Sequence, residues 1–135
     1  MAESRLIFDT GPLMLYFAED KRVKEMIGKV AAGIAEGFTS EVNLAELYYK
    51  TCEKLGREVA EVRHASIRHS KISISVVDES LTRLAGNLKC IHRGKLSLAD
   101  AYVIAVAKTR GGTLVTTDSR IVKLGIVQAK LLQIP

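Results

Sequence analysis

The 135-residue sequence contains no tryptophan, only two prolines and two cysteines, and few aromatic residues of any kind. Cys52 and Cys90 are too few for a disulfide framework and lack the spacing of a zinc site, so we expect both to be reduced, buried, small apolar side chains. The longest uninterrupted apolar run, residues 101–107, is far shorter than the ~20 residues that a membrane-spanning helix needs. The N-terminus also lacks the apolar stretch of a signal peptide. These absences predict a cytoplasmic protein without a membrane span.

The composition that is present is typical of one folded domain covering residues 1–135. Apolar residues make up 47% of the chain and charged residues 26%, close to a globular average. Lysine and arginine total 20 against 15 acidic residues, which gives a net charge of +5 and a pI near 9.3. A basic surface attracts phosphate polymers, although many proteins with such a pI bind none. The positions of the acids are therefore more informative than their number.

Hydrophobic periodicity predicts strands and helices that alternate along the chain. The expected strands cover residues 5–9, 38–39, 71–77, 113–117 and 130–134. The expected helices cover residues 20–36, 40–55, 57–70, 78–93 and 97–110, and the breaker sequence 10–12 follows the first strand. This alternation predicts an α/β fold, a three-layer sandwich whose central, mostly parallel sheet has helices on both faces. In such sheets ligands bind outside the carboxyl ends of the strands.

Four carboxylates are expected at that edge of the sheet. Asp9 and Asp118 end two strands, Asp100 lies in the first turn of an apolar helix, and Glu46 lies in the first half of the helix that Ser40 opens. Four carboxylates cannot all stay ionised at close range unless a cation holds them. Oxygen ligands suit a hard divalent ion, so the pattern indicates a Mg²⁺ or Mn²⁺ site.

Each acid taken alone also has a purely structural interpretation. These alternatives are a helix cap by Asp9, a capping box of Ser97 with Asp100, an ion pair of Glu46 with Lys50, and a turn cap by Asp118 at Ser119. Together they explain less, because an ionised carboxylate among the alanines and aliphatic residues around Asp100 needs a stronger partner. The three histidines, His64, His69 and His92, are expected at the surface, with no nucleophile motif beside them.

Four short segments carry a family resemblance. FDTGPL (8–13), SEVNLAEL (40–47), LSLADA (96–101) and LVTTD (114–118) resemble the acidic motifs of PIN-domain ribonucleases, and most closely the small VapC-type toxins of toxin–antitoxin pairs. The resemblance runs from residue 5 to about residue 134. The chain departs from the family where members often carry a second acid and an aromatic residue, because Arg120 and Ile121 stand there. Asp118 is therefore the only acid of the last motif.

The resemblance implies Mg²⁺-dependent or Mn²⁺-dependent endonucleolytic cleavage of RNA. It implies that Asp9 and Asp100 bind the metal directly, that Glu46 and Asp118 hold metal-bound waters or a second ion, and that Thr116 orients a water or a carboxylate. The implied partners are an RNA substrate, a small antitoxin protein and a second copy of the chain.

Two groups of residues are candidates for binding these partners. The phosphate contacts would come from four basic residues in or just before the turn that leads to Asp100: Arg83, Lys89, Arg93 and Lys95. The alternative interpretation of these residues is a solvated charged face. The antitoxin groove and the dimer contact would come from apolar residues of the early helices that we expect to be exposed: Met14, Leu15, Phe17, Tyr48 and Tyr49.

Helix geometry separates Glu46 from Glu41, which lies five residues earlier on the same predicted helix. Five residues turn a side chain by about 500°, which leaves the two carboxylates roughly 140° apart. Only one of them can face the site. Glu41 lies in the first turn, where the helix dipole favours a carboxylate, so we expect Glu46 to be the functional acid.

Other functions remain open at the level of sequence. An aspartyl phosphatase of the haloacid dehalogenase type needs a second acid two residues after Asp9, where Gly11 stands. A phospho-receiver domain needs paired acids in the first loop and a lysine late in the chain, and Asp9 alone fills the first of these requirements. A PIN nuclease of RNA processing without a toxin role, and a catalytically silent PIN-like module that binds RNA or a protein, are both compatible with the motifs.

Overall fold

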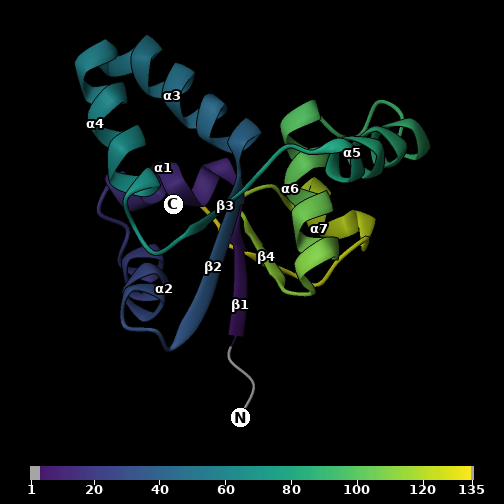
Figure 1. Ribbon diagram of the computed structural model, residues 1–135, viewed down its shortest axis with the longest axis horizontal. Helices are drawn as coiled ribbons and strands as arrows, with labels where there is room; N and C mark the ends of the chain where they lie inside the picture. The colour runs from purple at the N-terminus through teal and green to yellow at the C-terminus, as the bar shows by residue number, and fades with distance from the viewer. Residues whose placement is uncertain (1–3, 135) are drawn as a thin grey trace.

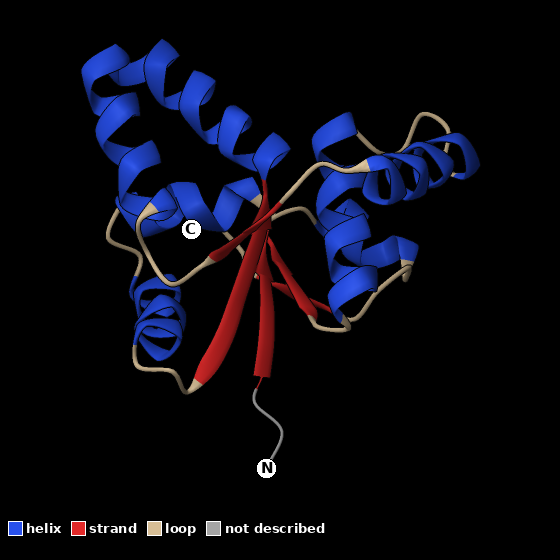
Figure 2. Ribbon diagram, viewed as in Figure 1, coloured by secondary structure: helices blue, strands red, loops and turns tan. Residues whose placement is uncertain are grey.

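A five-stranded parallel sheet between two layers of helices forms the centre of the computed structural model, which describes residues 4–134 (Figure 2). The strand order is β3-β2-β1-β4-β5, and every neighbouring pair is parallel. The strands are β1 (Ser4–Phe8), β2 (Ala35–Ser40), β3 (Ser73–Ser75), β4 (Thr113–Thr116) and β5 (Ala129–Leu131). The predicted α/β three-layer architecture is confirmed.

The helices divide between the two faces of the sheet (Figure 1). One face carries α1 (Thr10–Phe17), α2 (Lys21–Ala31), α3 (Glu41–Leu55) and α4 (Arg57–Arg68), and the other carries α5 (Glu79–Ile91), α6 (Leu98–Arg110) and α7 (Ser119–Leu124). Because successive residues of a strand point to opposite faces, Ile7 packs toward α5 and α6 while Phe8 packs toward α1 and α2. Each layer therefore has its own apolar core.

Helix boundaries follow the capping signals of the sequence. Ser40, Asp78 and Ser97 each accept a hydrogen bond from the backbone N–H three residues later, at the starts of α3, α5 and α6. At the other end of α6, Gly111 adopts a φ of 69°, the left-handed conformation that glycine takes without steric cost. These caps set where α3 and α6 begin, which is the edge of the sheet where the strands end.

The helix predicted over residues 20–36 is too long. It ends at Ala31, Ile34 lies in the following turn with 63% of its surface exposed, and β2 is longer than the expected strand at residues 38–39. Gly37 lies inside β2 and does not stop a helix. A Cβ there would lie 3.0 Å from the Val30 side chain, so the glycine lets α2 approach the sheet closely.

The sequence 10–12 begins a helix that the periodicity did not reveal. Pro12 lies in the first turn of α1, where its missing N–H costs nothing, and Asp9 caps the helix by accepting from the N–H of Thr10. Gly11 permits a close approach, since a Cβ at that position would lie 2.2 Å from the hydroxyl oxygen of Thr117. The tight entry into α1 thus holds Asp9 against the end of β4.

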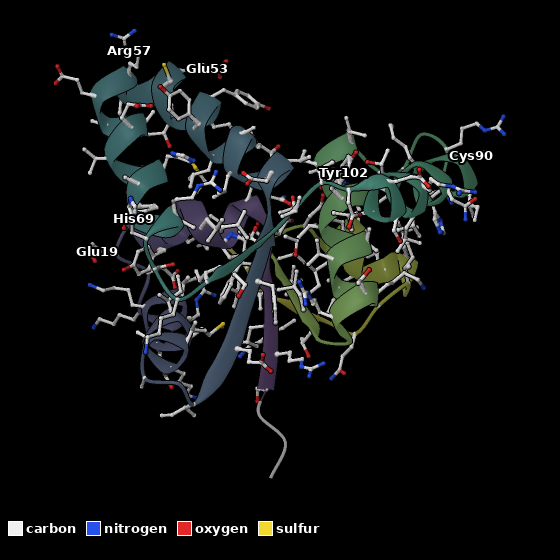
Figure 3. All side chains as sticks on the ribbon, in the orientation of Figure 1. Glu19, Glu53, Arg57, His69, Cys90 and Tyr102 are labelled. Atoms are coloured by element: carbon white, nitrogen blue, oxygen red, sulfur yellow. The ribbon has the colours of Figure 1, made fainter. Side chains whose placement is uncertain are left out.

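Several surface expectations are wrong. Cys90 is exposed at the outer end of α5 and Cys52 is only partly buried, although both are free thiols (Figure 3). Of the five apolar residues expected at the surface, only Tyr49 is exposed. The other four are half-buried: Met14, Leu15, Phe17 and Tyr48. The three of these that lie on α1 are half-buried because α1 packs against both α2 and α3. Over residues 4–134, no helix is both long and apolar enough to cross a bilayer.

Candidate active site

The carboxyl ends of β1 and β4 meet beside the N-termini of α3 and α6. Phe8 pairs with Val115, and the N–H of Asp9 donates to the Val115 carbonyl over 3.0 Å. Asp9 and Thr116, which directly follow this pair, are consequently neighbours. The parallel register of two adjacent strands therefore forms the base of the site.

Asp9 is a buried carboxylate with protein donors on both oxygens. Its Oδ2 accepts from the Thr116 hydroxyl at 2.7 Å, and its Oδ1 accepts from the Thr10 N–H at 2.8 Å and from the Asn43 amide at 3.4 Å. Only 6% of the residue is exposed. Thr116 thus holds one oxygen of the Asp9 carboxylate, and its role in orienting a water or a carboxylate during catalysis stays a prediction.

Asn43 is a site residue that the sequence analysis missed. It is fully buried in the first turn of α3, and its amide Nδ2 also donates to the Thr10 hydroxyl at 3.1 Å. Its Oδ1 accepts from the Ser40 hydroxyl, so the N-cap of α3 is tied to the first turn of α1. A signal was available, because amides are rare in this chain and Asn43 stands between apolar residues three positions after a helix cap.

Burial raises the pKa of Asp9 to about 6, and the hydrogen bonds from Thr116 and Thr10 only partly oppose this effect. The negative charges of Asp100 and Glu46 make smaller contributions to the same rise. These three carboxylates are therefore close enough for their charges to interact. A site that disfavours a buried anion and adds two more anions around it is suited to a cation.

Asp100 and Glu46 also make the structural contacts that their positions suggested. Asp100 completes a capping box, with its Oδ2 accepting from the Ser97 N–H at 3.0 Å. The Glu46 carboxylate lies 3.3 Å from the Lys50 ammonium. Both structural contacts are therefore present, and the charges of Asp100 and Glu46 nevertheless raise the pKa of Asp9.

Glu41 faces away from this group. Arg68 of α4 donates to both of its carboxylate oxygens at 2.7 Å, and this pairing lowers the pKa of Glu41. The charges acting on Asp9 include that of Glu46 and not that of Glu41. The geometry agrees with the helical angle between the two glutamates.

Asp118 follows β4 and is held by an arginine of its own helix. Arg120 donates from its backbone N–H and its Nε to Asp118 Oδ1, at 2.9 and 3.2 Å, and from Nη2 to Oδ2 at 2.9 Å. This pairing lowers the pKa of Asp118. The Asp118 N–H donates to the Thr116 hydroxyl at 3.1 Å, which links the last acid to the oxygen that holds Asp9.

The donor set fits a hard divalent cation in chemistry and in charge, since all its members are carboxylates around a buried Asp9. The side chains do not form a preassembled cage. Within residues 4–134, no three His, Cys, Asp or Glu side chains are grouped closely enough to hold a metal ion. Glu46 and Asp118 form ion pairs with Lys50 and Arg120, which offset their negative charges.

The candidate phosphate contacts divide into engaged and available side chains. Arg83 lies 3.8 Å from Glu79 on α5, and the Lys89 ammonium donates to the Leu96 carbonyl at 2.9 Å, which ties α5 to the turn before α6. Arg93 and Lys95 are exposed, with no ion pair among the described residues. Of the histidines, His69 is exposed, whereas His64 and His92 are partly buried.

The sequence matches the family model of the PIN domain over residues 6–127, and the chain belongs to this family. A search of curated proteins found no significant relative.

Solved structures of toxin–antitoxin proteins share the fold. VapBC2 from Rickettsia felis, bound to a promoter DNA fragment, superposes with a TM-score of 0.76 at 17% identity, covering 94% of this chain and 98% of that chain. VapBC from Salmonella typhimurium, bound to DNA, gives a TM-score of 0.74 at 16% identity and coverages of 94% and 97%. VapC20 from Mycobacterium tuberculosis, a toxin that cleaves the sarcin-ricin loop, gives 0.72 at 21% identity and coverages of 91% and 97%.

The raised pKa of Asp9 predicts that this residue destabilises the metal-free protein at neutral pH. A carboxyl with a pKa of about 6 in the folded state and 3.8 in the unfolded state binds its proton more tightly when folded, so stability falls as the pH rises from about 4 to about 6. The shift corresponds to roughly 3 kcal/mol. Compared with the wild type in EDTA, Asp9→Asn should gain up to this amount of unfolding free energy between pH 4 and pH 7.5, measured by urea denaturation.

The comparison between the two pH values isolates the titration of Asp9, because any loss of hydrogen bonds in the Asn variant is present at both. A difference in unfolding free energy that stays the same at pH 4 and pH 7.5 would contradict the assignment.

Proposed function

We propose that this chain is a divalent-metal-dependent endoribonuclease, folded as a single PIN nuclease domain, and that it is the toxin of a toxin–antitoxin pair. The observation that carries the proposal is the buried Asp9, whose pKa is raised by burial and by the charges of Asp100 and Glu46, at the strand ends of a PIN fold. The solved structures of similar fold include a toxin that cleaves the sarcin-ricin loop and several toxin–antitoxin complexes, which supports RNA as the substrate and an antitoxin as the partner.

In this proposal the four acids divide the work. Asp9 and Asp100 bind the ion, and Glu46 and Asp118 orient water molecules around it. Thr116 and Asn43 fix the Asp9 carboxylate, so that little reorganisation is needed when substrate arrives. When bound, Mg²⁺ or Mn²⁺ lowers the pKa of a water molecule and stabilises negative charge on the phosphate in the transition state.

Metal-dependent cleavage is the first test of this function. The purified protein should cleave structured RNA in Mg²⁺ or Mn²⁺ and stop in excess EDTA. Asp9→Asn and Asp100→Asn should each lower the cleavage rate by about two orders of magnitude or more, because a carboxylate that binds the ion is lost. The measurement is the rate of product formation on denaturing gels, with circular dichroism as the control for folding. Cleavage that continues undiminished in EDTA would refute the metal-dependent mechanism.

The two glutamates of α3 provide a matched pair for the second test. Glu46→Gln should reduce the cleavage rate by at least tenfold, because its charge acts on Asp9, with little change in fold. Glu41→Gln should leave the rate within a few-fold and cost about 1 kcal/mol of stability, since it breaks a partly exposed ion pair with Arg68. Equal rate losses in both variants, or a loss confined to Glu41→Gln, would contradict the assignment of Glu46.

A homodimer is part of the proposed assembly, and the exposed apolar residues of the α3–α4 pair favour its interface. Tyr49, Leu55 and Val62 are 48%, 53% and 69% exposed. Leu55 lies between Glu53 and Arg57, which Figure 3 places at the tip where α3 turns into α4. Light scattering should give twice the monomer mass at micromolar concentration, and Val62→Glu should shift the protein toward monomer. A strict monomer across this range would rule out the dimer.

A further inference from the structure

A basic hollow lies where the turn before α6 meets α7. It is lined by Gly94, Lys95, Arg120, Lys123 and Leu124, and its volume is about 250 Å³. Gly94 adopts a φ of 75°, and the Lys95 N–H donates to the His92 carbonyl at 3.0 Å. A left-handed glycine thus turns the chain so that Lys95 faces the helix carrying the other two cations.

The hollow gathers three cations, and among the described residues only Arg120 has a carboxylate partner. Seven basic side chains elsewhere lie within 4 Å of a carboxylate: Arg5, Arg22, Lys24, Lys29, Lys50, Arg68 and Arg83. Lys95 and Lys123 have no such partner within the described part of the chain, and Arg120 is paired only with Asp118. Three gathered cations share one carboxylate, so the hollow keeps an excess of positive charge that favours an anion.

Arg120 connects the hollow to the acidic site. It forms three hydrogen bonds with Asp118. One wall of the hollow is therefore in direct contact with one of the proposed catalytic acids. An anion bound here would lie beside the reacting phosphate and not at it, because the carboxylates would repel an anion from their own position.

We propose that Lys95, Arg120 and Lys123 form a binding subsite for an RNA phosphate that neighbours the phosphate to be cleaved. The inference rests on the proposed ribonuclease function and deepens it, because it identifies which cations position the substrate. Arg120 stands where many PIN domains carry a second acid after the last motif. A positive side chain at this position would bind phosphate, whereas a negative one would bind metal. The lysines contribute charge and reach, and Arg120 contributes its Nη1 group, which does not donate to Asp118.

Binding of RNA without cleavage isolates this subsite. We would measure the fluorescence anisotropy of a labelled, unstructured 12-nucleotide RNA in EDTA, for the wild type and for Lys95→Gln/Lys123→Gln, between 50 and 200 mM salt. The double variant should bind several-fold more weakly at low salt. Its plot of log K against log salt should be shallower by about 0.7, because one phosphate contact of a single strand is lost.

Lys21→Gln/Lys108→Gln is the matched control, since it removes the same charge from two exposed lysines. Lys21 begins α2 on the other face of the sheet, and Lys108 lies eight residues along α6 from Asp100, roughly 12 Å along the helix axis. The control should keep the salt dependence of the wild type. Equal losses in both double variants, or wild-type binding in Lys95→Gln/Lys123→Gln, would overturn the subsite.

The experiment separates the two proposals because it requires no catalysis. Selective weakening by the Lys95 and Lys123 changes supports the subsite whether or not the protein cleaves RNA when metal is added. Cleavage in Mg²⁺ together with RNA binding that is indifferent to these two lysines would leave the proposed function intact and refute the subsite.

Discussion

The burial of one carboxylate, that of Asp9, is the constraint on which the arrangement of the site depends. An ionised carboxylate with 6% exposure is unfavourable unless donors surround it, and here the donors come from three elements. Thr116 at the end of β4, the N–H of Thr10 in α1 and the amide of Asn43 in α3 all converge on it. These contacts fix the relative positions of the strand ends and the two helices more tightly than apolar packing alone would.

Three acids of the candidate site also cap helices, so their structural role and their proposed role in the site are compatible. Asp9 caps α1, Asp100 completes the capping box of α6, and Asp118 caps α7. A cap places a carboxylate beside the backbone N–H groups of a helix start, and helix starts in a parallel α/β fold gather at the ends of the strands. Helix capping therefore places these acids at the same edge of the sheet.

The sequence was sufficient for the features that depend on local chemistry. The helix caps at Ser40, Asp78 and Ser97, the alternation of strands and helices, and the edge where Asp9 and Asp118 lie all follow from short-range signals. It failed where tertiary contacts decide. Gly37, which directly follows the predicted helix 20–36, lies in β2 and allows α2 to pack on the sheet. The position of Asn43 against Asp9 depends on two residues that are 34 positions apart. The ion pair of Asp118 with Arg120 could not be predicted from the sequence, because it depends on the backbone conformation at the start of α7.

The charge balance of the site bears on how many metal ions the proposed enzyme holds. Four acids, Asp9, Glu46, Asp100 and Asp118, contribute four negative charges when ionised, and the ion pairs with Lys50 and Arg120 offset two of them. The remaining charge, 4 − 2 = 2, matches one divalent ion. A second ion would need Glu46 and Asp118 to exchange their protein partners for metal, at the cost of leaving two cations without counter-charges. The pairing of Arg120 with Asp118 therefore favours a single ion in the proposed enzyme, which Asp9 and Asp100 would hold.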